Sequence, residues 1–239
     1  MRRFFIHTRD INKEDVRITG SDVHHIRDVL RLGPGAQVVC IDESAAEHEV
    51  NLTEVAEDAV TGRIIKTTRP ERPIVEVALF QGLPKGRKFD FVVEKATELG
   101  ADTITPVLME RSVPGGEGAA KRTERRQRVA TAAAKQSRRA TLPEIGAPVD
   151  FPTLVDALGS YDRVLLFWEG AREPVDEALR NFTGKSLALI IGPEGGLAAR
   201  EVEALLSAGA TPAWLGPRIL RTETAPIVAL AVVNHVLRR

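Results

Sequence analysis

The larger part of the chain alternates between strand and helix patterns, and this alternation restricts the possible folds more than any other feature. From residue 74 onward, short apolar runs take turns with longer stretches of helical periodicity. The expected strands are residues 74–80, 103–109, 164–168, 187–191 and 211–215, and the expected helices are residues 88–99, 121–139, 173–181, 198–208 and 224–237. Such an order predicts an α/β fold, a mostly parallel sheet with helices on both faces. Ligands bind at the carboxyl ends of the strands in these sheets, so the loops after Trp168, Ile191 and Leu215 are the first candidates for a site.

The first 70 residues follow another pattern. Short strands are expected at residues 4–6, 16–18, 37–41, 50–52 and 61–65, with turns between them, which predicts a small barrel. One helix is expected at residues 21–31, where Ser21 or Asp22 can cap the start and Gly33 follows the end. Prolines in residues 69–73 indicate a linker, because each removes a backbone donor and disfavours helix before it. We therefore expect domains at residues 1–70 and 73–239.

Composition excludes several classes of protein. The 239 residues carry 33 Lys and Arg against 33 Asp and Glu, which excludes a uniformly basic nucleic-acid coat but not a local basic patch. The single cysteine, Cys40, excludes an intrachain disulfide, and no histidine stands at a metal-ligand spacing, so no metal is expected. The N-terminus lacks the apolar region of a signal peptide, and no window approaches the roughly 20 apolar residues of a membrane span. We expect a soluble cytoplasmic protein that makes no membrane contact.

A glycine-rich turn follows the most apolar strand pattern. Residues 192–196 read Gly-Pro-Glu-Gly-Gly and come directly after the expected strand 187–191. Glycines let a backbone approach a ligand closely. No Lys-Ser/Thr pair follows, and the spacing is not that of a dinucleotide fingerprint, so neither ATP nor NAD binding is supported. The turn is either a plain tight turn or part of a binding site.

A second candidate segment is residues 215–225, which lie between the last strand and the last helix. It contains Arg218, Arg221 and Glu223, and either Thr222 or Thr224 can cap the helix that follows. Glycine and proline hold this loop rigid while it presents charged groups, as loops at functional sites do.

Basic residues gather in three places. The loop at residues 85–88 is one, and the cluster His24, His25, Arg27 and Arg31 is another. The expected helix 121–139 has eight Lys and Arg against the single acid Glu124. Such a helix is either an ordinary solvated face or a surface for phosphate contacts.

Taken together, these segments resemble the SPOUT methyltransferases, and more narrowly the bacterial family that methylates N3 of a uridine in small-subunit (16S) ribosomal RNA. The resemblance rests on residues 192–196 and 215–225, and it extends in the same order to residues 2–5, 24–31 and 85–100. It implies a small N-terminal PUA-like β-barrel that binds RNA and a C-terminal α/β domain with a trefoil knot. It also implies S-adenosyl-L-methionine as cofactor, small-subunit ribosomal RNA or the small ribosomal subunit as partner, and a homodimer.

The resemblance also assigns roles to residues. Arg221 is the candidate for positioning the uridine and stabilising its charge, and Glu223 or Glu194 is the candidate general base, or else the acceptor for the amino group of the cofactor. The expected cofactor-binding residues are Phe167, Gly192, Gly195, Gly196, Leu215, Gly216, Ile219, Leu220 and Ala225. The expected RNA-binding residues are Arg2, Arg3, His25, Arg27, Arg31, Lys85, Arg87, Lys88, Arg125, Arg126 and Arg138.

Two departures and two alternatives accompany the resemblance. Ala198 stands where Ser or Thr often caps the helix after the glycine turn, and Lys135 stands where an acid is common. One alternative keeps the fold but methylates a ribose 2′-hydroxyl or another RNA. The other is a non-catalytic RNA-binding assembly factor, which would not bind S-adenosyl-L-methionine.

Overall fold

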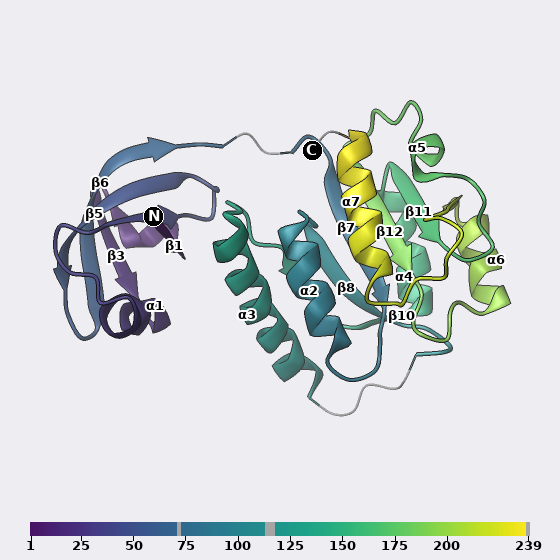
Figure 1. Ribbon diagram of the computed structural model, residues 1–239, viewed down its shortest axis with the longest axis horizontal. Helices are drawn as coiled ribbons and strands as arrows, with labels where there is room; N and C mark the ends of the chain where they lie inside the picture. The colour runs from purple at the N-terminus through teal and green to yellow at the C-terminus, as the bar shows by residue number, and fades with distance from the viewer. Residues whose placement is uncertain (71–72, 113–117, 238–239) are drawn as a thin grey trace. The chain divides into compact units, whose positions relative to one another are not determined.

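The computed structural model describes residues 1–70, 73–112 and 118–237 (Figure 1). The chain forms two compact units, one of Met1–Arg72 with Lys135–Thr141 and the other of Pro73–Ala134 with Leu142–Arg239. Residues 71–72 of the expected linker lie outside the described residues. Within the described part, no helix is long and apolar enough to cross a membrane.

The first unit is built on a six-stranded sheet. Its strands are β1 (Arg2–Phe5), β2 (Ile11–Asn12), β3 (Asp15–Thr19), β4 (Gln37–Ile41), β5 (Glu47–Val55) and β6 (Ala59–Thr68), in the order β1-β4-β5-β6-β3-β2. The pair β1 and β4 is parallel and the other pairs are antiparallel. Alternate residues such as Val16 and Ile18 of β3 point into a core shared with Phe4 and Ile26, as the period-2 pattern of a half-buried strand requires.

The helix expected at residues 21–31 is shorter and differently capped. It consists of α1 (Ser21–His24) and a π-helical segment η2 (His25–Val29). The cap position is Gly20, without a side-chain cap, so the prediction of Ser21 or Asp22 as cap is wrong. Arg31 rather than Gly33 adopts the left-handed conformation after the helix, with φ of 52°. A further short element, the 3-10 turn η1 (Thr8–Asp10), precedes β2.

The second unit contains the parallel sheet that the alternating pattern predicts. Its strands are β7 (Glu76–Gly82), β8 (Thr103–Leu108), β9 (Glu144–Ile145), β10 (Val149–Asp150), β11 (Arg163–Phe167), β12 (Ser186–Ile191) and β13 (Thr211–Ala213). The order is β10-β8-β7-β12-β11-β13, with β9 beside β8, and every pair is parallel. The parallel α/β prediction is confirmed.

Helices cover both faces of this sheet. On one face lie α2 (Lys88–Glu98), α3 (Ala119–Ser137), α5 (Val175–Ala178) and α7 (Ala225–Leu237), and on the other lie α4 (Phe151–Ala157), η3 (Leu158–Ser160) and α6 (Ala199–Ser207) (Figure 1). In β12, Leu187, Leu189 and Ile191 enter the first core while Ala188 and Ile190 enter the second. A strand buried on both faces must be apolar throughout, which explains why residues 187–191 carried a clear strand pattern.

The helix after the glycine turn has no side-chain cap from Ala198, but Glu201 ties its first turn together. The Glu201 carboxylate accepts a hydrogen bond from the Ala198 amide at 2.9 Å, and its other oxygen accepts one from the Glu110 amide at 2.8 Å. Glu201 is buried. It therefore satisfies one free backbone donor at the start of α6 and joins the helix to the end of β8.

Candidate functional site

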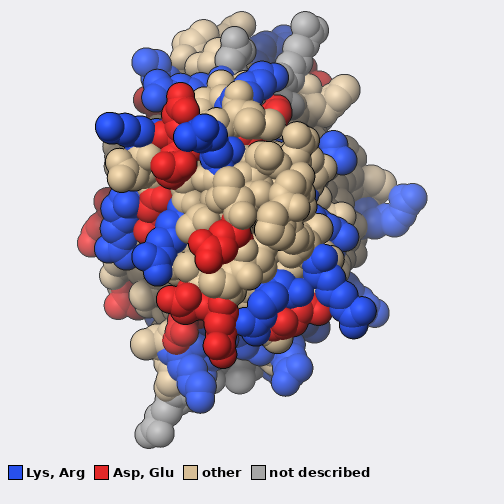
Figure 2. Space-filling view, turned by 90° about the vertical axis from the view of Figure 1, so that its left-hand side faces the viewer, with Lys and Arg blue, Asp and Glu red and all other residues tan. Residues whose placement is uncertain are grey.

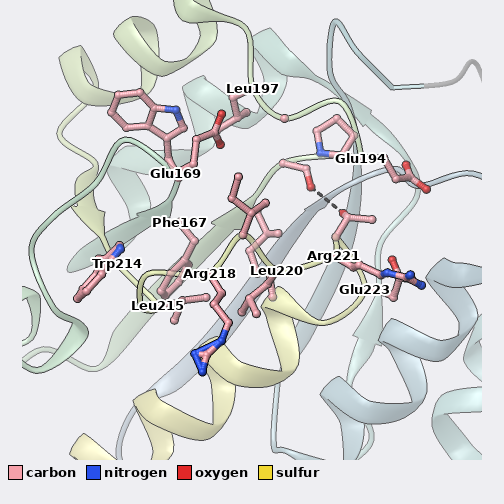
Figure 3. A pocket seen from close by; sticks show the side chains of 18 of the residues that line it. Phe167, Glu169, Glu194, Leu197, Trp214, Leu215, Arg218, Leu220, Arg221 and Glu223 are labelled. Carbon is pink, nitrogen blue, oxygen red and sulfur yellow. Dashed lines mark hydrogen bonds between the residues drawn. The ribbon is translucent and has the colours of Figure 1, made fainter.

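The carboxyl ends of β11, β12 and β13 meet around a pocket of about 810 Å³. Three loops line it: residues 167–172 after β11, 191–197 after β12 and 213–225 after β13, joined by Lys88 of α2. These are the three loops expected from the topology of the sheet. In Figure 3, Glu194, Arg221 and Glu223 lie toward one side of the pocket, and Glu169 and Trp214 lie toward the other.

Close backbone packing fixes the glycine turn. A Cβ atom added to Gly82, at the end of β7, would lie 2.4 Å from the Pro193 nitrogen and 2.8 Å from the Gly192 carbonyl carbon. Gly196 has φ of +69°, a conformation that other residues rarely adopt. The Arg111 guanidinium donates to the Gly195 carbonyl at 2.9 Å. Close packing against Gly82, the conformation of Gly196 and the hydrogen bond from Arg111 thus fix the turn, and its residues line the pocket.

A buried polar link joins the turn to the third loop. The Gln81 amide nitrogen donates to the Thr222 hydroxyl oxygen at 2.9 Å, and that hydroxyl donates to the Gly192 carbonyl at 2.8 Å. The Thr222 hydroxyl is therefore committed to the turn, so the prediction of Thr222 as an alternative helix cap is wrong. Gln81 was missed by sequence reasoning, because a single polar residue at the end of an apolar strand has no recognisable motif.

Apolar side chains and backbone make up much of the pocket wall. Every residue predicted to bind the cofactor lines it: Phe167, Gly192, Gly195, Gly196, Leu215, Gly216, Ile219, Leu220 and Ala225. The expected loop at residues 167–170 supplies Trp168 and Glu169 as well, whereas the lining residues Arg172 and Trp214 lie outside the expected loops. Their positions after β11 and β13 were the only signal that could have found them.

Three charged residues form one end of the pocket. The Lys88 ammonium lies 3.2 Å from a Glu194 carboxylate oxygen and 3.4 Å from a Glu223 carboxylate oxygen. Burial raises the pKa of Glu194, but hydrogen bonds from its own amide, the Lys85 amide and the Lys88 ammonium outweigh this, so the pKa falls below its ordinary value. The hydrogen bond to Glu194 raises the pKa of Lys88, against partial burial, and Glu223 adds to the increase. The site therefore holds ionised groups of both signs.

Arg221 differs from these residues. Its side chain is exposed at the pocket rim. None of the ion pairs formed among the described residues involves it. A guanidinium that is not paired can bind a negatively charged or carbonyl-bearing ligand bidentately. The exposed Ile219, at 88% of its full accessibility, lies in the same loop.

The RNA-binding candidates of the first unit differ in exposure and pairing. Arg2 and Arg31 are exposed, whereas Arg3 is paired with Glu47. Arg27 is paired with Asp28 at 2.8 Å, and this hydrogen bond is the main cause that lowers the pKa of Asp28 to about 2. The exposed His25 lies edge-on to the Phe4 ring. In Figure 2, basic and acidic side chains are interspersed around an uncharged area rather than gathered in one basic surface.

The remaining RNA-binding candidates divide in the same way. Lys85, Arg87 and Arg138 are exposed, and Lys88 belongs to the pocket. Arg125 pairs with Asp90 at 2.6 Å.

Arg126 is only 4% exposed and its guanidinium lies 4.2 Å from the centre of the Phe89 ring. Burial lowers its pKa from the ordinary value, although Asp90 opposes this. A side chain packed in this way stabilises the interior and is not offered to a ligand.

The described residues contain no group of three or more His, Cys, Asp or Glu side chains that could hold a metal ion.

Comparison with known proteins gives the class. The family model described as an RNA methyltransferase domain matches residues 70–234, and the one described as an RNA methyltransferase PUA domain matches residues 18–65. These matches define an RNA methyltransferase that carries a PUA domain, in agreement with the SPOUT resemblance.

Individual relatives narrow this class. Ribosomal RNA small subunit methyltransferase E of Bacillus subtilis is 34% identical over 250 residues, which cover 98% of this chain and 96% of the relative. The protein of the same name from Mycobacterium tuberculosis is 34% identical over 230 residues, 93% of this chain and 87% of the relative. A crystal structure of that enzyme from Neisseria gonorrhoeae, bound to S-adenosyl methionine, has a TM-score of 0.86 at 29% identity and covers 99% of this chain and 98% of its own. The chain belongs to this family, the ribosomal RNA small subunit methyltransferases E.

Proposed function

We propose that the protein transfers the methyl group of S-adenosyl-L-methionine to N3 of a uridine in small-subunit (16S) ribosomal RNA. The observation that carries the proposal is the pocket itself, a glycine-lined hollow at three strand ends with two carboxylates and an unpaired guanidinium at its edge. The names of the relatives support ribosomal RNA as substrate, and the bound ligand of the Neisseria gonorrhoeae enzyme supports the cofactor.

The residues of the pocket suit this cofactor. Gly192, Gly195 and Gly196 leave their backbone open to a ligand, and a volume of about 810 Å³ admits a nucleoside with an amino-acid tail. Phe167 and Leu220 offer apolar surface for a purine ring, and carboxylates at the other end offer acceptors for an ammonium group. When bound, S-adenosyl-L-methionine supplies an electrophilic methyl group on a positively charged sulfur.

Uridine N3 needs help before it can accept a methyl group, because its lone pair is free only after the N–H proton has left. A carboxylate at the pocket edge, Glu223 or Glu194, is in a position to accept that proton. The resulting negative charge spreads over N3 and the two flanking carbonyl groups, and the Arg221 guanidinium would stabilise it. N3 lies on the pairing edge of the base, so the uridine must be unpaired or flipped out of a helix.

RNA contacts would come from exposed basic residues of both units. We retain Arg2, Arg31, Lys85, Arg87 and Arg138 as the phosphate-binding candidates and omit the buried Arg126. We further propose that residues 1–70 act as the RNA-binding domain and residues 73–239 as the methyltransferase domain.

Two features of the family architecture complete the proposal. The SPOUT resemblance implies a trefoil knot, and we propose that it includes the third loop beside the glycine turn, where Thr222 donates to the Gly192 carbonyl. Half-exposed apolar side chains along α7, among them Ile227, Val228 and Val232, support a homodimer, because a second copy would cover them. Sedimentation at micromolar concentration tests the dimer.

Incubation of the protein with labelled S-adenosyl-L-methionine and undermethylated small ribosomal subunits tests the activity. We expect label at N3 of one uridine, located by nuclease digestion and mass spectrometry. Label on a ribose 2′-hydroxyl would support a different acceptor. If the correctly folded protein transfers no label and shows no cofactor binding by calorimetry, that result would support a non-catalytic assembly factor.

RNA binding is tested separately by the salt dependence of affinity. Arg87→Ala removes an exposed cation and should reduce the salt slope by about one unit if Arg87 neutralises a phosphate. Arg180→Ala is the matched control, because that exposed arginine is already paired with Glu177. Equal slopes for both variants and the unmodified protein would exclude Arg87 from the RNA surface.

A further inference from the structure

Lys88, Glu194 and Glu223 form a charged cluster whose members come from three separate segments. Lys88 is the first residue of α2, Glu194 belongs to the glycine turn after β12, and Glu223 belongs to the loop before α7. We refer to these three residues as the Lys88 cluster. Two carboxylates share one ammonium there, at 3.2 Å and 3.4 Å, so their roles depend on how each is held.

The two carboxylates are held differently. Both oxygens of Glu194 accept a hydrogen bond from the Lys85 amide, at 3.1 Å and 3.3 Å, and one of them also contacts the Lys88 ammonium. Among the hydrogen bonds and ion pairs of the described residues, Glu223 has only the ion pair with Lys88. Its Oε2 atom, which faces the Lys88 ammonium at 3.4 Å, is buried and accepts no hydrogen bond of ordinary geometry. Glu223 is therefore oriented by the Lys88 ammonium and not by backbone groups.

This difference separates the two possible functions. Both carboxylate oxygens of Glu194 accept hydrogen bonds from the segment at residues 85–88, and these contacts connect that segment to the glycine turn. Hydrogen bonds to the charged form of a carboxylate make it a weaker base. Glu223 lines the pocket and accepts no backbone hydrogen bond, so Lys88 alone orients its carboxylate, and it is the better candidate for the general base.

We propose that Lys88 is a positioning residue for methyl transfer, which holds Glu223 in place as the general base while Glu194 anchors Lys88. This inference rests on the proposed function. In the step concerned, the N–H bond of the uridine imide breaks and an O–H bond forms at Glu223, while the electron pair of the N–H bond stays on N3. Lys88 touches neither N3 nor the methyl group and acts through Glu223 alone.

The positive charge of Lys88 lies between the two carboxylates and offsets their mutual repulsion. Other charged side chains also line the pocket with Glu223: Glu169, Arg172, Glu194, Arg218 and Arg221. Of the ion pairs among the described residues, Glu223 forms only the one with Lys88. Removal of that positive charge leaves Glu194 and Glu223 as neighbouring like charges, so Glu223 would ionise only at higher pH.

The pH dependence of steady-state methylation tests this, with kcat and KM measured separately for each variant. Lys88→Met should lower kcat with little change in the KM for RNA. It should also move the acidic limb of the pH–rate profile, where kcat falls as pH falls, upward by roughly one pH unit. Lys88→Arg keeps the charge and should restore both kcat and the limb. Glu223→Gln should lower kcat by about 10²-fold or more and abolish the limb, whereas Glu194→Gln should lower kcat less and retain it.

Lys95→Met is the matched control. Lys95 lies on the same helix and its ammonium also joins two carboxylates, those of Glu94 and Glu98 at 2.7 Å and 2.8 Å, but it does not line the pocket. Its loss should leave the pH profile unchanged.

Three results would overturn the inference. Lys88→Met with an unmoved acidic limb would reduce Lys88 to a structural role. An acidic limb that disappears in Glu194→Gln would make Glu194 the base. A folded Glu223→Gln variant with near-normal kcat would exclude Glu223. Failure of the unmodified protein to methylate uridine N3 would instead refute the proposed function, so the two failures are distinguishable.

Discussion

Replacement of Gly82 by Ala gives the sharpest test of how the pocket is held together. The added Cβ would lie 2.4 Å from the Pro193 nitrogen and 2.6 Å from the Pro193 Cδ atom. Ordinary contact begins at 3.4 Å, so β7 and the glycine turn would have to separate by about 1 Å, the difference between 3.4 and 2.4 Å. The neighbouring atoms belong to backbone and a proline ring, which cannot rotate away. Overpacking of this kind costs about 1–3 kcal/mol of unfolding free energy.

The same displacement should reach the pocket, because Gly192 and Pro193 line it. We expect urea denaturation to show the loss of stability, and calorimetry with S-adenosyl-L-methionine to show affinity reduced by at least about tenfold, since small displacements in a pre-formed site are costly. Gly159→Ala is the control, because a Cβ there meets nothing within 4 Å. If Gly82→Ala matches this control in both stability and affinity, the close packing of β7 against the turn does not support the pocket.

Three other variants test separate parts of the structure. Thr222→Val should cost about 1–3 kcal/mol by urea denaturation, because it removes two buried hydrogen bonds, the one from Gln81 and the one to the Gly192 carbonyl, each worth about 0.5–1.5 kcal/mol; Thr222→Ser should restore the loss. Ala198→Ser should add up to about 1 kcal/mol, since a hydroxyl at this position can accept from a backbone amide in the first turn of α6. Hydrogen bonds from the Thr8 hydroxyl and amide, and then from His7, lower the pKa of Glu43 from 4.5 to about 2. The stability from this group is therefore complete above pH 4.5 and lost as pH falls through 2, so Glu43→Gln should flatten the acid dependence of unfolding in that window.

The sequence predicted the elements whose pattern is local. The strand at residues 187–191 is apolar at every position, because both faces of β12 are covered, and no other pattern competes with that reading. Gly100 was expected to end α2, and its φ of +84° confirms this. The short elements α4, β9 and β10 were missed, because two to seven residues carry too little periodicity to identify them.

The surroundings of the basic side chains could not be predicted from the sequence near them. The basic run at residues 121–139 gave no indication that Arg126 turns inward, because its partners Phe89 and Asp90 lie on another helix. Lys88 carried the same signal as Lys85 and Arg87, a basic loop, yet it alone of the three lines the pocket. Which cation serves the site depends on how α2 begins relative to two loops that are more than 100 residues away in sequence.

The sequence by itself determined the class of fold, the loops that form the pocket and the residue types available for chemistry. Strand and helix periods, glycines at tight turns and the order of the segments are local properties, and each follows from the conformational limits of single residues. Only the tertiary structure decided which groups meet. Gln81, Thr222 and Gly192 come together because β7 and β12 are neighbours in the sheet, and Lys88 lies between Glu194 and Glu223 because three chain segments converge. Hydrogen bonds and ion pairs act over about 3 Å, so they depend on proximity in space that a reading of single segments does not contain.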